Sequence, residues 1–212
     1  MPLSEAMRYL GASTENTVLR PQVEAMLRSV SDTPRYIYRV FDLTFPEGVP
    51  HLAHIALPGE SAKKMLSGCE KAVILACTMG LSFDRRLRSL QARSMADALI
   101  LNACGSALVE QGCDIAETEI SARFPNLFLT DRFSPGYGDL PLSVQKELCE
   151  ALDTSRRLGI VLTDSMMMNP SKSVTAIIGL AATPRMACIR GCAYCSLKET
   201  CALRKGGNHC GF

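Results

Sequence analysis

The sequence predicts an α+β protein in which a mostly antiparallel, curved sheet is flanked by helices. The prediction rests on an N-terminal region with helical periodicity, an alternating strand-like run at 35–45, and later apolar runs that alternate with helical segments. Beyond Pro184 the composition changes to cysteine, basic residues and glycine. We therefore expect one domain over 1–184 and a separate cysteine-rich tail over 185–212.

The N-terminal segments predict two helices followed by a strand. "LSEAMRYLGA" has apolar residues at helical spacing and Gly11 as a stop, and a second helix is expected around Pro21. "RYIYRVFDLTF" alternates large apolar and polar residues before Pro46. This alternation predicts either the first strand of the sheet or an edge strand.

The central segments predict a short helix, a buried strand and a long helical region. "SAKKMLSG" has the pattern of a helix closed by Gly68, and the apolar run in "KAVILACTMG" is typical of a buried strand. The helical pattern over 83–124 is long enough for two helices, or for one helix bent at Gly105 or Gly112.

The later segments predict a strand, a glycine-containing loop, a helix and a hairpin. "NLFLTDRFSPGYGD" leads from a strand into the loop, and "PLSVQKELCEALD" predicts a helix with proline in its first turn. "GIVLTDSMMMNPSKSVTAIIGLAA" predicts two strands joined by "NPSK". In such a strand Met166–Met168 point to alternate faces, either as flexible core filling or as an apolar wall against a large flat cofactor.

Charge and hydropathy exclude some classes of protein. The chain has 23 basic and 21 acidic side chains and a formal net charge of +2, without a run of five like charges, which argues against a nucleic-acid-binding surface. No apolar stretch is long and uncharged enough to predict a membrane span. The first residues lack the pattern of a signal peptide, so we expect a cytoplasmic location.

The ten cysteines fall into two groups of different character. One group lies singly in apolar segments and is expected to be reduced and buried: Cys69, Cys77, Cys104, Cys113 and Cys149. The other group is crowded into the tail: Cys188, Cys192, Cys195, Cys201 and Cys210. With no signal peptide to suggest secretion, the tail is better explained as a metal site than as a disulfide framework.

Three polar features are candidates for binding. In "RFSPGYGD", Arg132 offers a planar fork of donors that suits a carboxylate, and Gly136 lets a ligand approach the main chain, although a tight turn with a solvated arginine explains the pattern as well. Glu110 in an apolar helix lies either at the surface or opposite a cation. The arginines at 85–93 form either a solvated helix face or a site for an acidic partner or a phosphate-bearing ligand.

Three motifs together carry a resemblance to a known family. An RxxxGY motif, formed by Arg132, Gly136 and Tyr137, precedes an LT(D/E)S strand and a PxxSV turn. In this order they resemble the activation domain of vitamin B12-dependent methionine synthase, in a short stand-alone form. The resemblance covers roughly 73–180 and is weaker over 1–70.

The resemblance implies an activity and a set of partners. Such domains bind S-adenosylmethionine and dock onto a corrinoid protein whose cobalt has become inactive Co(II). One electron and the sulfonium methyl group then restore methylcobalamin. The chain is thus expected to be an S-adenosylmethionine-dependent cobalamin methyltransferase that reactivates methionine synthase or another corrinoid protein. A low-potential electron donor is a further expected partner, and a homodimer remains open.

The resemblance also implies roles for individual residues. Arg132 would hold the methionine carboxylate of the ligand, the backbone of 134–137 would line its adenosine, and Glu110 would make an acidic contact. Tyr137 is the candidate catalytic residue. Ile178 and Gly179 occupy positions where the family has aromatic ligand contacts, so the chain departs from the family there. The expected binding set is Glu110, Arg132, Ser134, Pro135, Gly136, Tyr137, Ile178 and Gly179.

The tail lies outside the resemblance, so its role is inferred from spacing. Cys188, Cys192 and Cys195 have the CxxxCxxC spacing of radical S-adenosylmethionine enzymes, but the few residues that follow Cys195 cannot build the barrel those enzymes need. With Cys201 and Cys210 the tail supplies enough thiolates for a [4Fe–4S] cluster or a zinc ion. A cluster would suit electron relay. A disulfide, a corrinoid contact or no ligand remain alternatives.

Two rival functions remain. A non-catalytic corrinoid-protein partner or chaperone would keep the fold and use the tail as a structural zinc knuckle. An ATP-driven corrinoid activator is disfavoured, because the sequence contains no GxxxxGK(S/T) phosphate loop.

Overall fold

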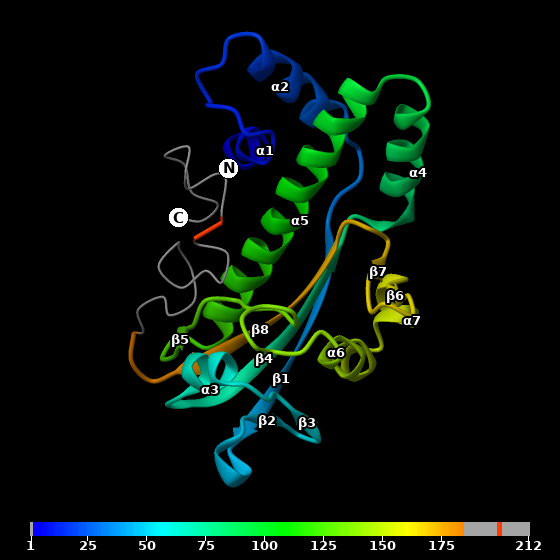
Figure 1. The fold of residues 1–212 in the computed structure, drawn as a ribbon. Coiled ribbons are helices and arrows are strands. Elements are labelled where there is room, and N and C mark those ends of the chain that lie inside the picture. The colour runs from blue at the N-terminus through cyan, green and yellow to red at the C-terminus, as the bar shows by residue number, and fades with distance from the viewer. Residues whose placement is uncertain (1, 185–198, 201–212) are drawn as a thin grey trace. The chain divides into compact units, whose positions relative to one another are not determined.

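The computed structural model describes residues 2–184 and 199–200 of the 212-residue chain. Within them it has seven α-helices, a six-stranded sheet that does not close into a barrel, and a separate two-stranded sheet (Figure 1). The predicted fold class, α+β with a mostly antiparallel sheet and flanking helices, is confirmed. The chain divides into two compact units: unit 1 is Met1–Ile37, Ala76–Thr118 and Cys149–Val174, and unit 2 is Tyr38–Leu75, Glu119–Leu148 and Thr175–Phe212.

Unit 1 is mainly helical. Its elements are α1 (Pro2–Tyr9), α2 (Leu19–Ser29), α4 (Gly80–Gln91), most of α5 (Met95–Arg123), α7 (Thr154–Leu158) and the paired strands β6 (Val161–Leu162) and β7 (Met168–Asn169). The predicted N-terminal helical region is present as α1 and α2. Met7 of α1 and Val23 of α2 pack with Ile100 and Cys104 of α5 in one buried cluster. Gly11 ends this first helical segment with a positive φ of 67°.

The long helical pattern is two helices, and they separate at residues 92–94, not at a glycine. α5 continues through Gly105 and Gly112, so the alternative of a bend at either glycine is wrong. Both glycines allow close packing instead: a methyl group at Gly105 would lie 2.4 Å from Cζ of Phe83, and one at Gly112 would lie 2.6 Å from Sγ of Cys77.

Unit 2 contains most of the main sheet. The strand order is β3 (Ile55–Ala56), β2 (His51–Leu52), β1 (Arg35–Thr44), β4 (Cys69–Thr78), β8 (Ser173–Ala181) and β5 (Phe128–Leu129). β1 is therefore the first strand in the chain and an inner strand of the sheet. The antiparallel registers pair Leu43 with Leu52 and Phe128 with Ala181. A one-turn 3-10 helix η1 (Pro46–Gly48), α3 (Glu60–Leu66) and the first part of α6 (Val144–Leu152) complete unit 2.

β4 and β8 are buried strands, as their unbroken apolar runs predict. Ala72–Leu75 of β4 have no exposed surface, and Ala176–Ala181 of β8 are equally enclosed. A strand that is covered on both faces needs no polar alternation, which is why both segments read as continuous apolar runs. The two strands are neighbours in the sheet, and the segment that carries the candidate site runs along β8.

The prediction that "NPSK" forms the turn of a hairpin is wrong. β6 pairs with β7 through the turn 163–167, whereas "NPSK" joins β7 to β8, which belong to different sheets. The turn lies before "NPSK" in the chain. There the N–H of Thr163 donates to the carbonyl of Met167 at 2.9 Å, and Met166 has a φ of +62°. The three methionines consequently do not share one strand.

The "NPSKS" segment instead fixes the start of α4 within unit 1. The carbonyl of Lys172 accepts the backbone N–H of Met79 at 2.9 Å, and Ser173 Oγ donates to Thr78 Oγ1 at 2.8 Å. Ser171 donates from its N–H and its hydroxyl to the buried carboxylate of Asp84, at 2.8 and 2.9 Å. The PxxSV motif therefore has a structural role here.

No helix in the described part of the chain combines the length and apolarity needed to cross a bilayer.

Replacing Gly105 tests the close packing of α5. Gly105→Ala is expected to lower the free energy of unfolding by about 1–3 kcal/mol, because the steric conflict with the buried ring of Phe83 exceeds the gain in helix propensity. Urea unfolding followed by far-UV circular dichroism measures the change. Asn102→Ala, at an exposed position of the same helix, is the control. Equal or higher stability of Gly105→Ala than of this control would contradict the packing argument.

Candidate functional site

The segment that carries Arg132 runs along β8 and contains a β-bulge. Leu129 pairs with Leu180, and Phe133 pairs with Ile177. Between these two pairs the segment has three residues, 130–132, whereas β8 has only two, so one residue is extra. Bulges redirect side chains at strand edges and are frequent next to functional sites. The bulge thus places Arg132 at an irregular point of the sheet.

Hydrogen bonds hold the bulge on both sides. The N–H of Thr130 donates to the carbonyl of Gly179 at 2.9 Å, and Thr130 Oγ1 accepts the N–H of Gly179 at 2.8 Å. On the far side, Phe133 and Ile177 exchange two main-chain bonds of 3.0 and 2.7 Å. Arg132 itself is half-buried between these anchors. Its backbone is therefore positioned by residues on either side of it.

The loop after the bulge closes on itself. Ser134 Oγ donates to the carbonyl of Thr175 at 2.6 Å, and the N–H of Tyr137 donates to the carbonyl of Ser134 at 3.0 Å. The N–H of Gly136 donates to the carbonyl of Leu140 at 2.8 Å. Gly136 has a φ of +91°, a conformation that favours glycine, and the nearest atom to a methyl group there would be 3.7 Å away. Glycine is required for the backbone conformation, not for lack of space.

The loop exposes part of the predicted binding set and buries the rest. Gly136 and Tyr137 are exposed, the Tyr137 side chain by 56%, whereas Pro135 is buried. Ile178 has no exposed surface. A methyl group at Gly179 would lie 2.7 Å from Sγ of Cys69, so this position is closely packed as well. As placed, Ile178 and Gly179 offer no surface to a ligand.

Asp139 ties the loop to α3 within unit 2. Its carboxylate accepts the backbone N–H groups of Glu60 and Ser61, at 2.7 and 2.9 Å, and so caps a helix whose own N-cap residue, Gly59, has no side chain. These hydrogen bonds hold the pKa of the Asp139 carboxyl below its ordinary value. Sequence reasoning missed this contact. The available signals were the uncapped start of α3 and the aspartate that follows the loop glycines.

Glu110 lies in a different unit from the other predicted ligand contacts. It is a half-buried residue of α5 in unit 1, whereas Arg132, 134–137 and 178–179 belong to unit 2. In unit 1 the pKa of Tyr9 is raised, mainly by burial and next by the negative charge of Glu110. Glu110 therefore acts electrostatically on α1. Its predicted contact with the ligand stays a prediction.

The cysteines are described only in part. The five scattered cysteines are reduced and buried, as predicted. Burial raises the pKa of the Cys104 thiol to about 11, which disfavours the reactive thiolate. The five tail cysteines lie outside the described residues. Among the residues that the structure does describe, no group of His, Cys, Asp or Glu is arranged to hold a metal ion.

A family model matches one part of the chain. Residues 116–187 match the sequence model described as "Vitamin B12 dependent methionine synthase, activation domain". This confirms the family that the sequence resembles. The matched span contains the RxxxGY loop, the LT(D/E)S turn and the PxxSV segment. No curated protein sequence matches the chain.

A solved structure supports the same fold for nearly the whole chain. It is described as "Crystal Structure of the MetH Reactivation Domain bound to AdoHcy" and aligns with a TM-score of 0.66 at 14% identity. The alignment covers 97% of this chain and 83% of that chain. The activation-domain fold therefore extends over the N-terminal residues, where the sequence resemblance is weak.

Removing the Asp139 carboxylate tests the tie between the loop and α3. Asp139→Asn is expected to lower the unfolding midpoint at pH 7, because an ionised carboxylate accepts the two N–H groups of α3 more strongly than an amide does. The folded-state pKa lies below the ordinary value of 3.8, so this contribution is complete above that value and disappears as the pH falls through the folded pKa.

Urea unfolding of both proteins between pH 7 and pH 2.5 measures this dependence. Asp164→Asn, in the exposed turn of unit 1, is the matched control and should not change the midpoint. A difference between Asp139→Asn and the unsubstituted protein that persists unchanged at the lowest pH would contradict the capping role.

Proposed function

We propose that this protein binds S-adenosylmethionine through the loop 132–137 and transfers the methyl group to reduced cobalamin on a partner corrinoid protein. The observation that carries the proposal is the bulged segment along β8, which places Arg132 beside an exposed glycine loop. Support also comes from the solved relative, because its bound AdoHcy is what S-adenosylmethionine becomes after losing its methyl group.

The residues of the loop would bind the ligand at its charged and planar ends. Arg132 is suited to the methionine carboxylate, because a guanidinium can donate two parallel hydrogen bonds to it. The exposed backbone at Gly136 and the ring of Tyr137 are suited to the adenosine. Glu110 belongs to unit 1, and this proposal does not use it. Tyr137 contacts the ligand next to the reacting methyl group.

The proposed reaction balances with one external electron. Co(II) takes up that electron and becomes Co(I), whose electron pair forms the new bond to the methyl carbon. The S–CH3 bond breaks, and its electron pair stays on sulfur, which leaves as S-adenosylhomocysteine. The contribution of this chain is to hold the sulfonium in a fixed orientation. Such positioning by itself accelerates a transfer strongly.

We propose further that the cysteine tail holds a [4Fe–4S] cluster through four of its five cysteines. Thiolates are the ligands such clusters use, and several within one short segment satisfy the required number. When bound, a cluster carries one electron at a time, which matches the one-electron requirement of the reaction. Zinc bound to the same thiolates remains the alternative and would assign the tail a structural role.

Removing the guanidinium of Arg132 tests the ligand site. Arg132→Gln is expected to weaken the binding of S-adenosylmethionine and of S-adenosylhomocysteine by at least about tenfold each. Both ligands carry the carboxylate, and the substitution removes a charged hydrogen bond to it. Isothermal titration calorimetry measures both affinities. Methyl transfer to free cob(I)alamin, generated with titanium(III) citrate, should fall in parallel when the ligand is subsaturating.

Arg157→Gln, an exposed arginine of α7 in unit 1, is the matched control and should leave both affinities unchanged. Unchanged affinity and unchanged methyl transfer in Arg132→Gln would overturn the proposal. That result would favour the rival reading of a non-catalytic corrinoid-protein partner or chaperone.

Metal analysis tests the tail. After anaerobic purification the protein is expected to contain about four iron and four sulfide per chain and to absorb in the visible range. Cys195→Ser should lose most of this iron, whereas Cys149→Ser, at a buried position outside the tail, should retain it. A colourless protein that contains zinc would rule out the electron relay and leave the methyl-transfer proposal untouched.

A further inference from the structure

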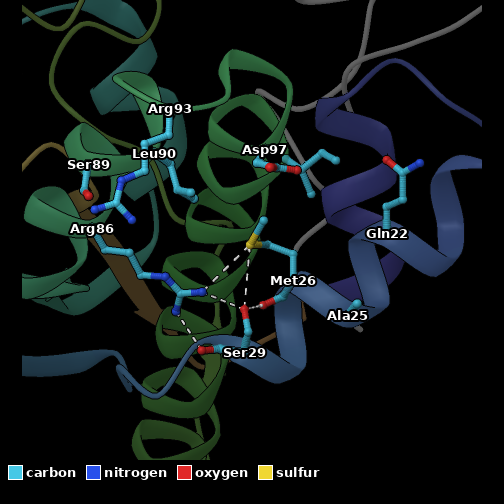
Figure 2. A pocket seen from close by; sticks show the side chains of 10 residues that line it. Gln22, Ala25, Met26, Ser29, Arg86, Ser89, Leu90, Arg93 and Asp97 are labelled. Carbon is cyan, nitrogen blue, oxygen red and sulfur yellow. Dashed lines mark hydrogen bonds between the residues drawn. The ribbon is translucent and has the colours of Figure 1, made fainter.

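Unit 1 contains a groove that is separate from the loop described above. Its volume is about 620 Å³, and residues of α2, α4 and α5 line it (Figure 2). The lining residues are Gln22, Ala25, Met26, Ser29, Arg86, Ser89, Leu90, Arg93, Asp97 and Ile100. This volume lies within the range of sites for nucleotide-sized molecules.

The groove follows from the periodicity of two helices. The lining residues of α2 and those of α4 with the turn after it each recur with spacings of three, four and seven. Residues at these spacings form one stripe along a helix, so each wall is a single face about two turns long. Ile100 of α5, with only 5% exposure, contributes an apolar part of the lining together with Met26 and Leu90.

Arg86 is a positively charged group held in a fixed position in this groove. Its Nη1 donates to the carbonyl of Ser29 and its Nη2 to Oγ of Ser29, both at 2.6 Å, and Nη2 also lies 3.9 Å from Sδ of Met26 (Figure 2). All three acceptors are neutral. Among the described residues no carboxylate lies within ion-pair distance of this half-buried guanidinium.

A half-buried cation without a counter-ion is an incomplete arrangement. Removing a guanidinium from water costs free energy that a bound anion would offset. The positive charge of Arg86 also reaches the buried Cys104, where it partly opposes the rise of the thiol pKa that burial causes. Arg93 brings a second guanidinium to the same groove, and Asp97 is the single carboxylate in its lining.

We propose that this groove binds a small organic phosphate whose apolar body rests on Met26, Leu90 and Ile100 and whose phosphate pairs with Arg86 and Arg93. A phosphate monoester suits the site, because its two negative charges match two guanidinium forks. The apolar lining requires a ligand with an aromatic or aliphatic body, so inorganic phosphate alone does not satisfy the groove. The proposal is independent of the proposed methyl transfer, because it uses none of the residues of the loop 132–137.

The probe for the test is 1-naphthyl phosphate, with 1-naphthol and inorganic phosphate as its two halves. Isothermal titration calorimetry and phosphorus NMR of the full chain measure binding. Naphthyl phosphate is expected to bind at least about tenfold more tightly than either half, because only it uses both the charged and the apolar part of the groove. No detectable binding of naphthyl phosphate at millimolar concentration, or equal affinity for one of its halves, would overturn the proposal.

Substitutions locate the binding. Arg93→Gln is expected to weaken the binding of naphthyl phosphate by about tenfold. Arg86→Lys is expected to weaken it by a similar factor, because lysine keeps the charge but loses the planar fork. Arg93 is exposed, so its substitution keeps the test valid even if Arg86→Lys lowers stability. Arg88→Gln, an exposed arginine of α4 outside the groove, is the matched control and should bind normally. Equal weakening in Arg88→Gln and Arg93→Gln would overturn the proposal, since it would indicate a general effect of surface charge.

Arg132→Gln separates this inference from the proposed function. It should leave the affinity for naphthyl phosphate unchanged and lower the affinity for S-adenosylmethionine. If Arg132→Gln abolishes binding of naphthyl phosphate, the probe occupies the loop and the groove is not its site. If the unsubstituted protein binds the probe normally but does not bind S-adenosylmethionine, the proposed function is wrong and the proposal for the groove is supported.

Discussion

The candidate site depends on the extra residue in the segment opposite β8. Because side chains alternate along a strand, one inserted residue changes the face on which every later side chain lies. Thr130 stabilises this irregularity, since its N–H and its hydroxyl satisfy both main-chain groups of Gly179. The loop with Gly136 then begins from a fixed point, and Asp139 attaches its far end to α3.

Close packing and hydrogen bonding explain small and polar residues in and near the motifs. Gly179 leaves room for the methyl of Thr130, which a side chain there would meet at 3.0 Å. Gly138 lets the loop approach Ser61 of α3. The PxxSV segment carries Ser173, whose hydroxyl donates to Thr78, the last residue of β4. Ser173, which belongs to one of the motifs that carry the resemblance, therefore holds the structure in place without any contact with a ligand.

Local patterns predicted the type of most elements but not their partners. The apolar runs of β4 and β8 and the helical periodicity of α1, α2 and α5 were sufficient to assign these elements. The hairpin was misplaced because a pattern does not reveal which strand pairs with which, and the turn at Thr163 was not recognised. Of the two alternatives for the long helical pattern, two helices are present, and Gly105 serves close packing within the second one.

The sequence by itself determined the fold class, the resemblance to the activation-domain family, the chemistry of Arg132 and the crowding of thiols in the tail. Those depend on residue type and on spacing along the chain. Only the tertiary structure decided that Ile178 is enclosed, that a bulge precedes the loop and that α2, α4 and α5 form a groove around Arg86. Burial and register arise from contacts between residues far apart in the chain. A local sequence pattern does not specify those contacts.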